Sequence, residues 1–138
     1  MVSEMNIANL LEEKKNKLGS KTAIIFREEN IAFSELRDNV FRVAGGLKGL
    51  GLKKGDKIAL YLPNCPEYIY AYLASWCLGL TVVPLDFMLT EEELVSCLSH
   101  SESKVLIMRM KSGISLAVLR DKIPTLKEVV DIGQAKDA

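Results

Sequence analysis

The chain has 138 residues, of which 49% are hydrophobic and 26% are charged, with 18 basic side chains against 18 acidic ones. This length and composition are typical of one ordinary globular domain with a real core. A formal net charge of +0 gives no general attraction to nucleic acid or to an anionic membrane.

No apolar run reaches the roughly 18 to 20 residues that cross a bilayer. The longest candidate, 68–85, is interrupted by Gly79 and Pro84. The N-terminal stretch contains acidic residues and lacks the basic-then-apolar order of a signal peptide. We therefore expect a cytoplasmic protein with no transmembrane segment and no nucleic-acid partner.

The three cysteines, Cys65, Cys77 and Cys97, are odd in number and have no CxxC spacing. A disulfide framework or a zinc site requires a more regular pattern. Thiols packed among other side chains are the expected state, because cysteine is among the most often buried residues.

The N-terminal third predicts a helix, a hairpin and a second helix. Asn6 is placed to cap the first helix. Two short apolar segments, 22–26 and 31–33, flank a polar turn and predict a β-hairpin. Ser34 is expected to cap the next helix, whose apolar residues recur at spacings of four and three and so share one face.

The glycine-rich segment 45–55 has the composition of a phosphate-binding loop but the wrong context. Such a loop follows a strand and opens a helix, so that the helix N-terminus faces the anion. Here the glycines end a helix and lead into a strand. We interpret Gly49 or Gly51 as a left-handed helix cap, and Gly45 with Gly46 as permitting close packing.

Two later helices begin with the pattern of a capping box. Asn64 precedes Glu67 by three residues, with Pro66 in the first turn, and Thr90 precedes Glu93 by the same interval. In such a box each side chain accepts a hydrogen bond from a backbone N–H of the other residue. Both pairs are therefore interpreted as helix starts.

Strands and helices alternate from residue 57 onwards. The expected helices are 7–18, 35–48, 65–78, 91–100 and 115–123. The expected strands beyond the hairpin are 57–62, 81–85, 104–108 and 127–132. This order predicts an α/β fold of three layers, with a mostly parallel sheet, flanking helices and an N-terminal β-hairpin. We expect this domain to span 1–132, with a frayed tail over 133–138.

Ligand sites in parallel sheets lie beyond the carboxyl ends of the strands. Those ends carry little chemistry here: Pro63-Asn64, Asp86-Phe87, Arg109 and Asp131. Capping already accounts for the polar pair Asn64 and Glu67. A phospho-acceptor role for Asp86 would need an acidic pair after the first parallel strand to hold a metal ion, and Pro63-Asn64 stand there instead.

His100 is the single histidine of the chain and lies between two serines at an expected helix C-terminus. A partial positive charge is favourable at that position, so a structural or solvated role explains it. No Ser/His/Asp group is assembled from the sequence.

The order of motifs resembles the opening part of the adenylate-forming (AMP-binding) enzymes, which include acyl-CoA synthetases. The residues that carry this resemblance are Gly55-Asp56-Lys57-Ile58-Ala59-Leu60, Pro63-Asn64-x-x-Glu67, Gly79, Pro84-Leu85-Asp86 and Leu89-Thr90-x-x-Glu93-Leu94. Further matches are Lys21-Thr22-Ala23-Ile24, Phe33-Ser34-Glu35-Leu36, Ala44-Gly45-Gly46-Leu47 and His100-Ser101-x-Ser103-Lys104-Val105-Leu106-Ile107. The resemblance spans about 5–132.

The resemblance implies a parent enzyme that uses ATP, Mg²⁺ and coenzyme A to turn a carboxylic acid, such as a fatty acid, into an acyl-adenylate and then a thioester. The family's Ser/Thr/Gly-rich loop and catalytic lysine have no counterpart here. Lys111-Ser112-Gly113 comes nearest to the loop but lacks its Thr-Gly repeat. We therefore expect no catalytic, cofactor-binding or metal-binding residue in this chain.

Two interpretations follow. The first is an N-terminal structural subdomain of an acid–CoA ligase, inactive alone, whose partner is the remainder of the ligase chain. The second is a free-standing interaction module of α/β fold that does not catalyse. As a truncated sheet, the chain is also expected to expose a sheet edge or apolar surface and so to self-associate.

Overall fold

The computed structural model describes residues 6–133, which form two compact units. The first, here called the helical unit, is drawn from Met1–Lys53 and Cys65–Gly79. The second, here called the sheet unit, is drawn from Lys54–Asn64 and Leu80–Ala138. The chain therefore passes from the helical unit into the sheet unit. It returns to the helical unit for the segment Cys65–Gly79 and then completes the sheet unit.

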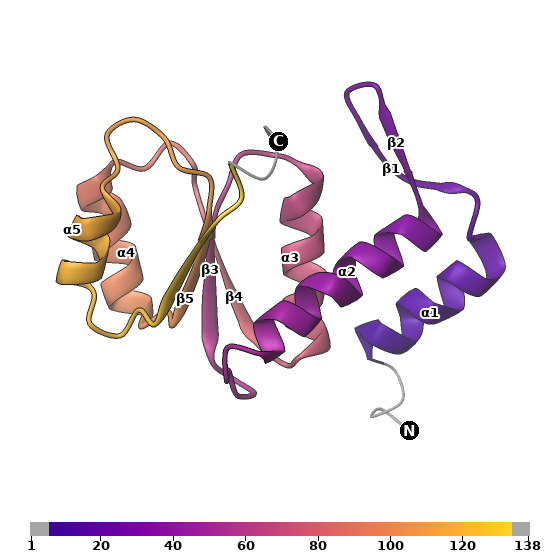
Figure 1. Ribbon diagram of the computed structural model, residues 1–138, viewed down its shortest axis with the longest axis horizontal. Coiled ribbons are helices and arrows are strands. Elements are labelled where there is room, and N and C mark those ends of the chain that lie inside the picture. Colours follow the sequence, from indigo (N-terminus) through magenta and orange to yellow (C-terminus); the bar gives the residue numbers. More distant parts are fainter. Residues whose placement is uncertain (1–5, 134–138) are drawn as a thin grey trace. The chain divides into compact units, whose positions relative to one another are not determined.

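The helical unit holds three helices and a two-stranded hairpin (Figure 1). Its elements are α1 (Ile7–Leu18), β1 (Thr22–Phe26), β2 (Glu29–Ala32), α2 (Phe33–Lys48) and α3 (Pro66–Cys77). α2 contacts both other helices, and both hairpin strands also contact α2. This support matters because an isolated two-stranded hairpin is at best marginally stable in water.

Polar contacts at α1 explain its position. Asn6 Oδ1 accepts a hydrogen bond from the Asn9 N–H at 2.8 Å, as predicted for the helix cap. Arg37 of α2 donates to Glu12 Oε1 of α1 at 2.7 Å, and its guanidinium lies 4.3 Å from the centroid of the Phe41 ring. Glu12 and Asp38 together raise the pKa of Arg37.

Two predictions about α2 are wrong in detail. The helix begins at Phe33, so its cap is Ala32 rather than Ser34, and the Ala32 N–H donates to Glu35 Oε1 at 3.1 Å. Gly45 and Gly46 do not serve close packing, because a Cβ atom at either position would meet nothing within 4 Å. Gly51, with φ +75°, takes the left-handed conformation expected of either Gly49 or Gly51.

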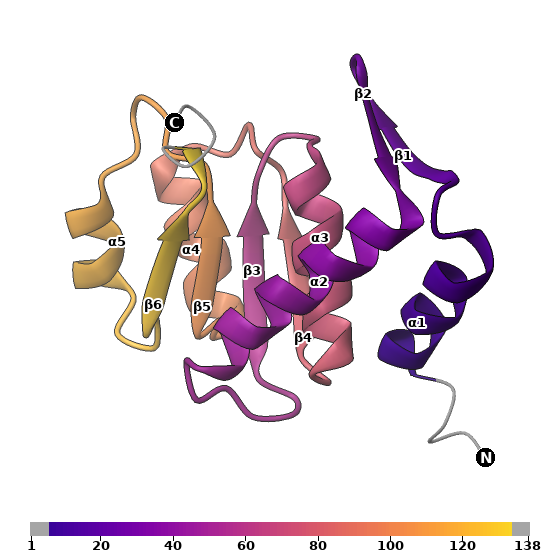
Figure 2. The same cartoon turned by 45° about the vertical axis from the view of Figure 1, so that its right-hand side comes forward.

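The sheet unit is a four-stranded parallel sheet in the order β4-β3-β5-β6 (Figure 2). The strands are β3 (Lys57–Tyr61), β4 (Thr81–Leu85), β5 (Val105–Met108) and β6 (Glu128–Asp131). The helices are α4 (Glu91–Ser101) and α5 (Leu116–Lys122). β3 and β5 are the central strands, which explains why β5 is apolar and buried throughout.

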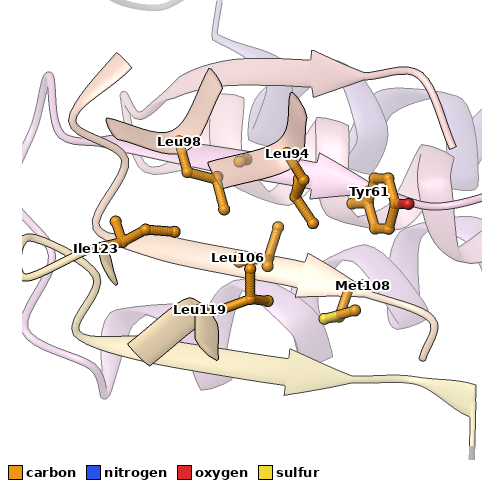
Figure 3. Close-up of a cluster of buried hydrophobic side chains, with 8 residues drawn as sticks. Tyr61, Leu94, Leu98, Leu106, Met108, Leu119 and Ile123 are labelled. Atoms are coloured by element: carbon orange, nitrogen blue, oxygen red, sulfur yellow. The ribbon is translucent and has the colours of Figure 1, made fainter. Parts of the chain in front are cut away.

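The core of the sheet unit lies between one face of the sheet and its two helices. Figure 3 shows Leu94 and Leu98 of α4, Leu119 of α5 and Ile123, which follows α5, in one cluster with Leu106 of β5. The strands contribute Ala59, Tyr61, Leu106 and Met108. All eight side chains are at most 1% exposed. Burying each large one contributes about 1.5 to 3 kcal/mol.

The two expected capping boxes have different outcomes. The box at α4 is confirmed: Thr90 Oγ1 accepts from the Glu93 N–H at 3.3 Å, and the Thr90 N–H donates to Glu93 Oε1 at 2.9 Å. The prediction of a capping box at α3 is wrong, because the cap of that helix is Cys65, whose side chain makes no capping hydrogen bond. Pro66 occupies the first helical position, which proline strongly favours, so the helix starts one residue later than expected.

The α/β class, the parallel sheet with flanking helices and the N-terminal hairpin are confirmed. Across residues 6–133, every helix falls short of the length and apolarity that a bilayer crossing requires. The tail expected to fray lies, apart from Gly133, outside the described residues.

Candidate functional site at the carboxyl edge of the sheet

All four strands of the sheet unit run in the same direction, so their carboxyl ends meet at one edge. The sequence placed Asn64, Asp86, Arg109 and Asp131 there, and each follows or ends one of the four strands. Ligands of open α/β sheets bind at this kind of edge. The carboxyl edge of the sheet is therefore the candidate site.

A lysine and two aromatic rings form the centre of this edge. The Tyr61 and Phe87 rings lie 5.1 Å apart, and the Lys111 ammonium lies 4.4 Å from the Phe87 centroid and 5.2 Å from that of Tyr61. Lys111 Nζ also donates a hydrogen bond to the Phe87 carbonyl oxygen. The positive charge thus faces two ring faces and a carbonyl group, an arrangement that stabilises a cation.

Side chains at this edge tie the loops to one another. The Tyr61 hydroxyl donates to the Leu89 carbonyl at 2.6 Å, which joins the end of β3 to the loop before α4. Glu91 Oε2 accepts from the Ser115 N–H at 2.6 Å, which joins the starts of α4 and α5.

The two aspartates of the edge accept hydrogen bonds from nearby backbone. Asp131 Oδ1 accepts from the N–H groups of Met110 at 3.1 Å and Gly133 at 2.9 Å. Asp86 Oδ1 accepts from the Met88 N–H at 2.8 Å and so shapes the loop after β4. Both aspartates therefore bind the protein's own backbone.

The remaining candidates are His100, Asn64 and the three cysteines. His100 is exposed in the last turn of α4, and Asn64 is exposed in the loop after β3. The three cysteines carry thiols rather than disulfides, and burial raises the pKa of the Cys77 thiol. Over residues 6–133, no three His, Cys, Asp or Glu side chains gather closely enough to hold a metal ion.

The segment 111–113 does not resemble a phosphate-binding site in structure. Its lysine is held against Tyr61 and Phe87, and Gly113, with φ +90°, lies in a turn before α5. The residues at this edge thus do not fit an ATP or magnesium site.

Sequence reasoning did not find the cluster of Tyr61, Phe87 and Lys111. These residues lie far apart along the chain and belong to different loops or strand ends. One signal was available, because Tyr61 is the last residue but one of the predicted strand 57–62 and Phe87 follows the predicted strand 81–85. Two aromatic residues at matching ends of neighbouring strands are placed to meet.

The sequence profile of the AMP-binding enzyme family matches residues 11–138. The match covers most of the chain, and it agrees with the fold and with the motif order described above. The chain belongs to the AMP-binding enzyme family.

Several members of this family are similar to the chain in sequence or in structure. The chain is 30% identical over 112 residues to the crotonobetaine/carnitine–CoA ligase of Salmonella paratyphi A, a match that covers 78% of this chain and 22% of the ligase. A Mycobacterium tuberculosis fatty acyl CoA synthetase is similar in structure, with a TM-score of 0.81 and 26% identity over 96% of this chain and 28% of that one. The N-terminal domain of FACL13 from the same organism matches with a TM-score of 0.80 and 25% identity, over 95% of this chain and 35% of that domain.

The chain spans about a fifth of the length of the curated relatives that it matches. It also spans about a third of the FACL13 N-terminal domain. The likeness is therefore to the scaffold of one part of these ligases, and it does not extend to the whole of any of them.

Proposed function

We propose that the chain is an N-terminal structural part of an ATP-dependent carboxylic acid–CoA ligase that works through an acyl-adenylate. The observation that carries this proposal is the family match over residues 11–138 together with the structural likeness to a ligase N-terminal domain. The named relatives act on different acids, and their common element is a carboxylic acid joined to coenzyme A. A free-standing interaction module is not favoured, because these relatives are ligases.

The proposed role of this part is to hold the fold, and none of its residues is assigned to catalysis. The hydrogen bonds of Tyr61, Lys111 and Asp131 support this role, since each of these groups already holds a loop or strand end. ATP, Mg²⁺ and coenzyme A are assigned to the whole enzyme. The remainder of a ligase chain is its proposed partner, and the cytoplasm is its proposed location.

ATP–pyrophosphate exchange tests the catalytic half of this proposal. The purified 138-residue chain, incubated with ATP, Mg²⁺, labelled pyrophosphate and a panel of short, long and aromatic acids, is expected to show no exchange above a protein-free blank. A full-length acyl-CoA synthetase run in parallel supplies the positive control. Exchange that depends on an acid and on the concentration of this chain would place catalytic residues within it and refute the proposal.

Self-association is the second part of the proposal. It is supported by apolar side chains that stay exposed in the folded chain, including Ile69 and Trp76 of α3. Exposed apolar surface of this kind is a common site of protein association.

A further inference from the structure

The amino edge of the sheet carries three lysines side by side, here called the lysine row. Lys57 begins β3, and Lys104 and Lys127 lie immediately before β5 and β6. The Lys104 N–H donates to the Lys57 carbonyl oxygen at 2.8 Å, and the Lys127 N–H donates to the Lys104 carbonyl oxygen at 2.7 Å. The backbones of the three lysines are therefore bonded to one another across neighbouring strands, whose amino ends lie together at the lower edge of the sheet in Figure 2.

The side chains of the lysine row leave the sheet on the same side. Two residues after each lysine comes a side chain of the core beneath α4 and α5: Ala59, Leu106 and Val129. Side chains two residues apart in a strand share a face, so the three lysines share the α4 and α5 side. Neighbouring strands lie about 4.8 Å apart, so the three ammonium groups are attached within a span of about 10 Å. Thr81, the ladder partner of Lys57 in β4, extends the row with a hydroxyl group.

One carboxylate pairs with the lysine row. Asp56 Oδ1 lies 3.0 Å from Lys104 Nζ, at the middle of the row, and the Asp56 side chain is 16% exposed. Lys57 and Lys127, on either side, are exposed, and neither forms an ion pair with any residue that the structure describes. Two of the three positive charges are therefore open to a ligand.

Other acidic residues toward this edge do not neutralise the lysine row. Glu128 follows Lys127, but its carboxylate lies 3.7 Å from Arg120. Glu102 caps α4 and Asp121 lies in the last turn of α5, and both are exposed. Within residues 6–133, neither of these two forms an ion pair with a lysine of the row. The row therefore keeps an excess of positive charge.

This excess of like charge on neighbouring strands points to a ligand. Like charges side by side in a sheet repel each other and reduce stability. Where a fold breaks such a local rule, a functional site is the expected reason. We propose that the lysine row, with Lys57 and Lys127 as the open charges, binds a compact anion with two or more phosphate groups, such as the diphosphate group of a small molecule. Lysine binds phosphate as a point charge and requires no fixed geometry of its ligand.

The distribution of charge in the sheet unit favours a compact anion over an extended one. The opposite, carboxyl edge is rich in acidic residues: Asp86, Glu91, Glu92, Glu93 and Asp131. Charges are screened beyond about 8 Å at physiological ionic strength, so a small anion on the row interacts with the lysines alone. Nucleic acid draws on many phosphate contacts at once, and three lysines supply few of them. This inference does not depend on the proposed ligase function, because the row lies at the edge opposite the candidate site.

Titration of the ¹⁵N-labelled 138-residue chain with inorganic pyrophosphate, at constant ionic strength, tests the proposal. The backbone amide signals of Lys57, Lys104 and Lys127 should shift and reach saturation, while those of the hairpin stay in place. ADP carries the same diphosphate group on a nucleoside. Equal affinity for ADP and pyrophosphate would show that the phosphates alone are recognised, and tighter binding of ADP would show that the nucleoside also contributes.

Lys57→Gln and Lys127→Gln are the test variants, because each removes one open charge and leaves the Lys104–Asp56 pair intact. Each should weaken pyrophosphate binding by about twofold to fivefold. Without the anion, each should raise the melting temperature by about 1 to 3 °C at low ionic strength, since a repulsion is removed. Lys21→Gln is the matched control, since Lys21 is an exposed lysine of the helical unit and should change neither quantity.

Shifts that do not saturate, or that sodium chloride reproduces at equal ionic strength, would overturn the proposal. So would row variants that bind pyrophosphate as tightly as the wild type does. A lower melting temperature in both variants would overturn it as well, because the lysines would then support the fold. Saturable binding of poly-glutamate without binding of pyrophosphate would replace the phosphate ligand by an acidic protein segment.

Discussion

α3 and α4 begin with the same polar pattern, yet only α4 forms the capping box. Thr90 and Glu93 exchange hydrogen bonds with each other's backbone, whereas Asn64 lies outside α3 altogether. The difference is Pro66, whose preference for the first helical position sets the start of α3. A capping pattern therefore predicts a helix start only where no stronger signal sets the first residue.

The two helices also differ in what they bury. α4 is amphipathic, and its Leu94 and Leu98 are fully buried in the core of the sheet unit. α3 is apolar on nearly all sides and keeps Ile69 and Trp76 exposed. The stability of α4 thus comes from both its cap and its packed face, while α3 depends on its inner face alone.

The largest difference in free energy of unfolding should appear when one buried residue of α4 and one exposed residue of α3 are each truncated to alanine. Leu98→Ala in α4 removes a fully buried side chain and should lower the free energy of unfolding by about 2 to 5 kcal/mol. Ile69→Ala in α3 should cost less than about 1 kcal/mol, because this side chain is 41% exposed. Urea unfolding of both variants at low protein concentration, where association is absent, measures the difference. Equal losses would show that the outer face of α3 is covered within the folded monomer.

Substitutions at the starts of α3 and α4 should differ in their effect on the free energy of unfolding, but by less than the two truncations above. Thr90→Ala removes the acceptor for the Glu93 N–H and should lower the free energy of unfolding by about 1 kcal/mol. Asn64→Ala is the matched control at α3, and its effect should be within about 0.5 kcal/mol of zero. Urea titration at pH 7 compares the two variants. A loss at Asn64 as large as that at Thr90 would restore the capping role that the structure denies to Asn64.

The pH dependence of the α4 cap should be the smallest effect. Hydrogen bonds from the Thr90 backbone and side chain lower the pKa of Glu93 below its usual 4.5. A carboxylate whose pKa is lowered on folding stabilises the protein above its unfolded-state pKa, and this contribution is lost as pH falls through the folded-state value. Glu93→Gln should therefore reduce the loss of stability on acidification below pH 4.5.

Glu92→Gln serves as the control for this pH dependence, because it removes a charge from the same helical turn without touching the cap. Thermal unfolding from pH 7 down to acid compares the two variants with the wild type. Identical pH profiles for Glu92→Gln and Glu93→Gln would mean that the effect comes from the charge of the first turn and not from the hydrogen bonds.

The regular elements were largely predictable because each rests on local signals. Residues 7–18, 22–26 and 81–85 have the same bounds in the structure as in the sequence prediction. Their ends are marked by Asn6, by the polar turn and by Gly79, which act over a few residues. The starts of α2 and α3 were misplaced by one or two residues, because neighbouring signals compete there.

The order of the strands and the contacts at the carboxyl edge were much harder to predict from the sequence. Local patterns do not say that β3 lies between β4 and β5, since β5 follows β3 after more than 40 residues. The cluster of Tyr61, Phe87 and Lys111 depends on that same pairing. The sequence placed Phe87 at the carboxyl edge, but it did not predict that Tyr61 and Lys111 would meet it there or that the lysine would be held by two rings and a carbonyl group.

The central place of β3 has a consequence for amide hydrogen exchange. β3 is hydrogen-bonded on one side to β4 and on the other to β5, so freeing its amides requires both ladders to open. β4 and β6 each have one side without a neighbouring strand among the described residues. The slowest amides of β3 should therefore exchange only through global unfolding, and those of the edge strands through smaller openings. Exchange rates along β3 thus give the free energy of unfolding of the sheet unit directly.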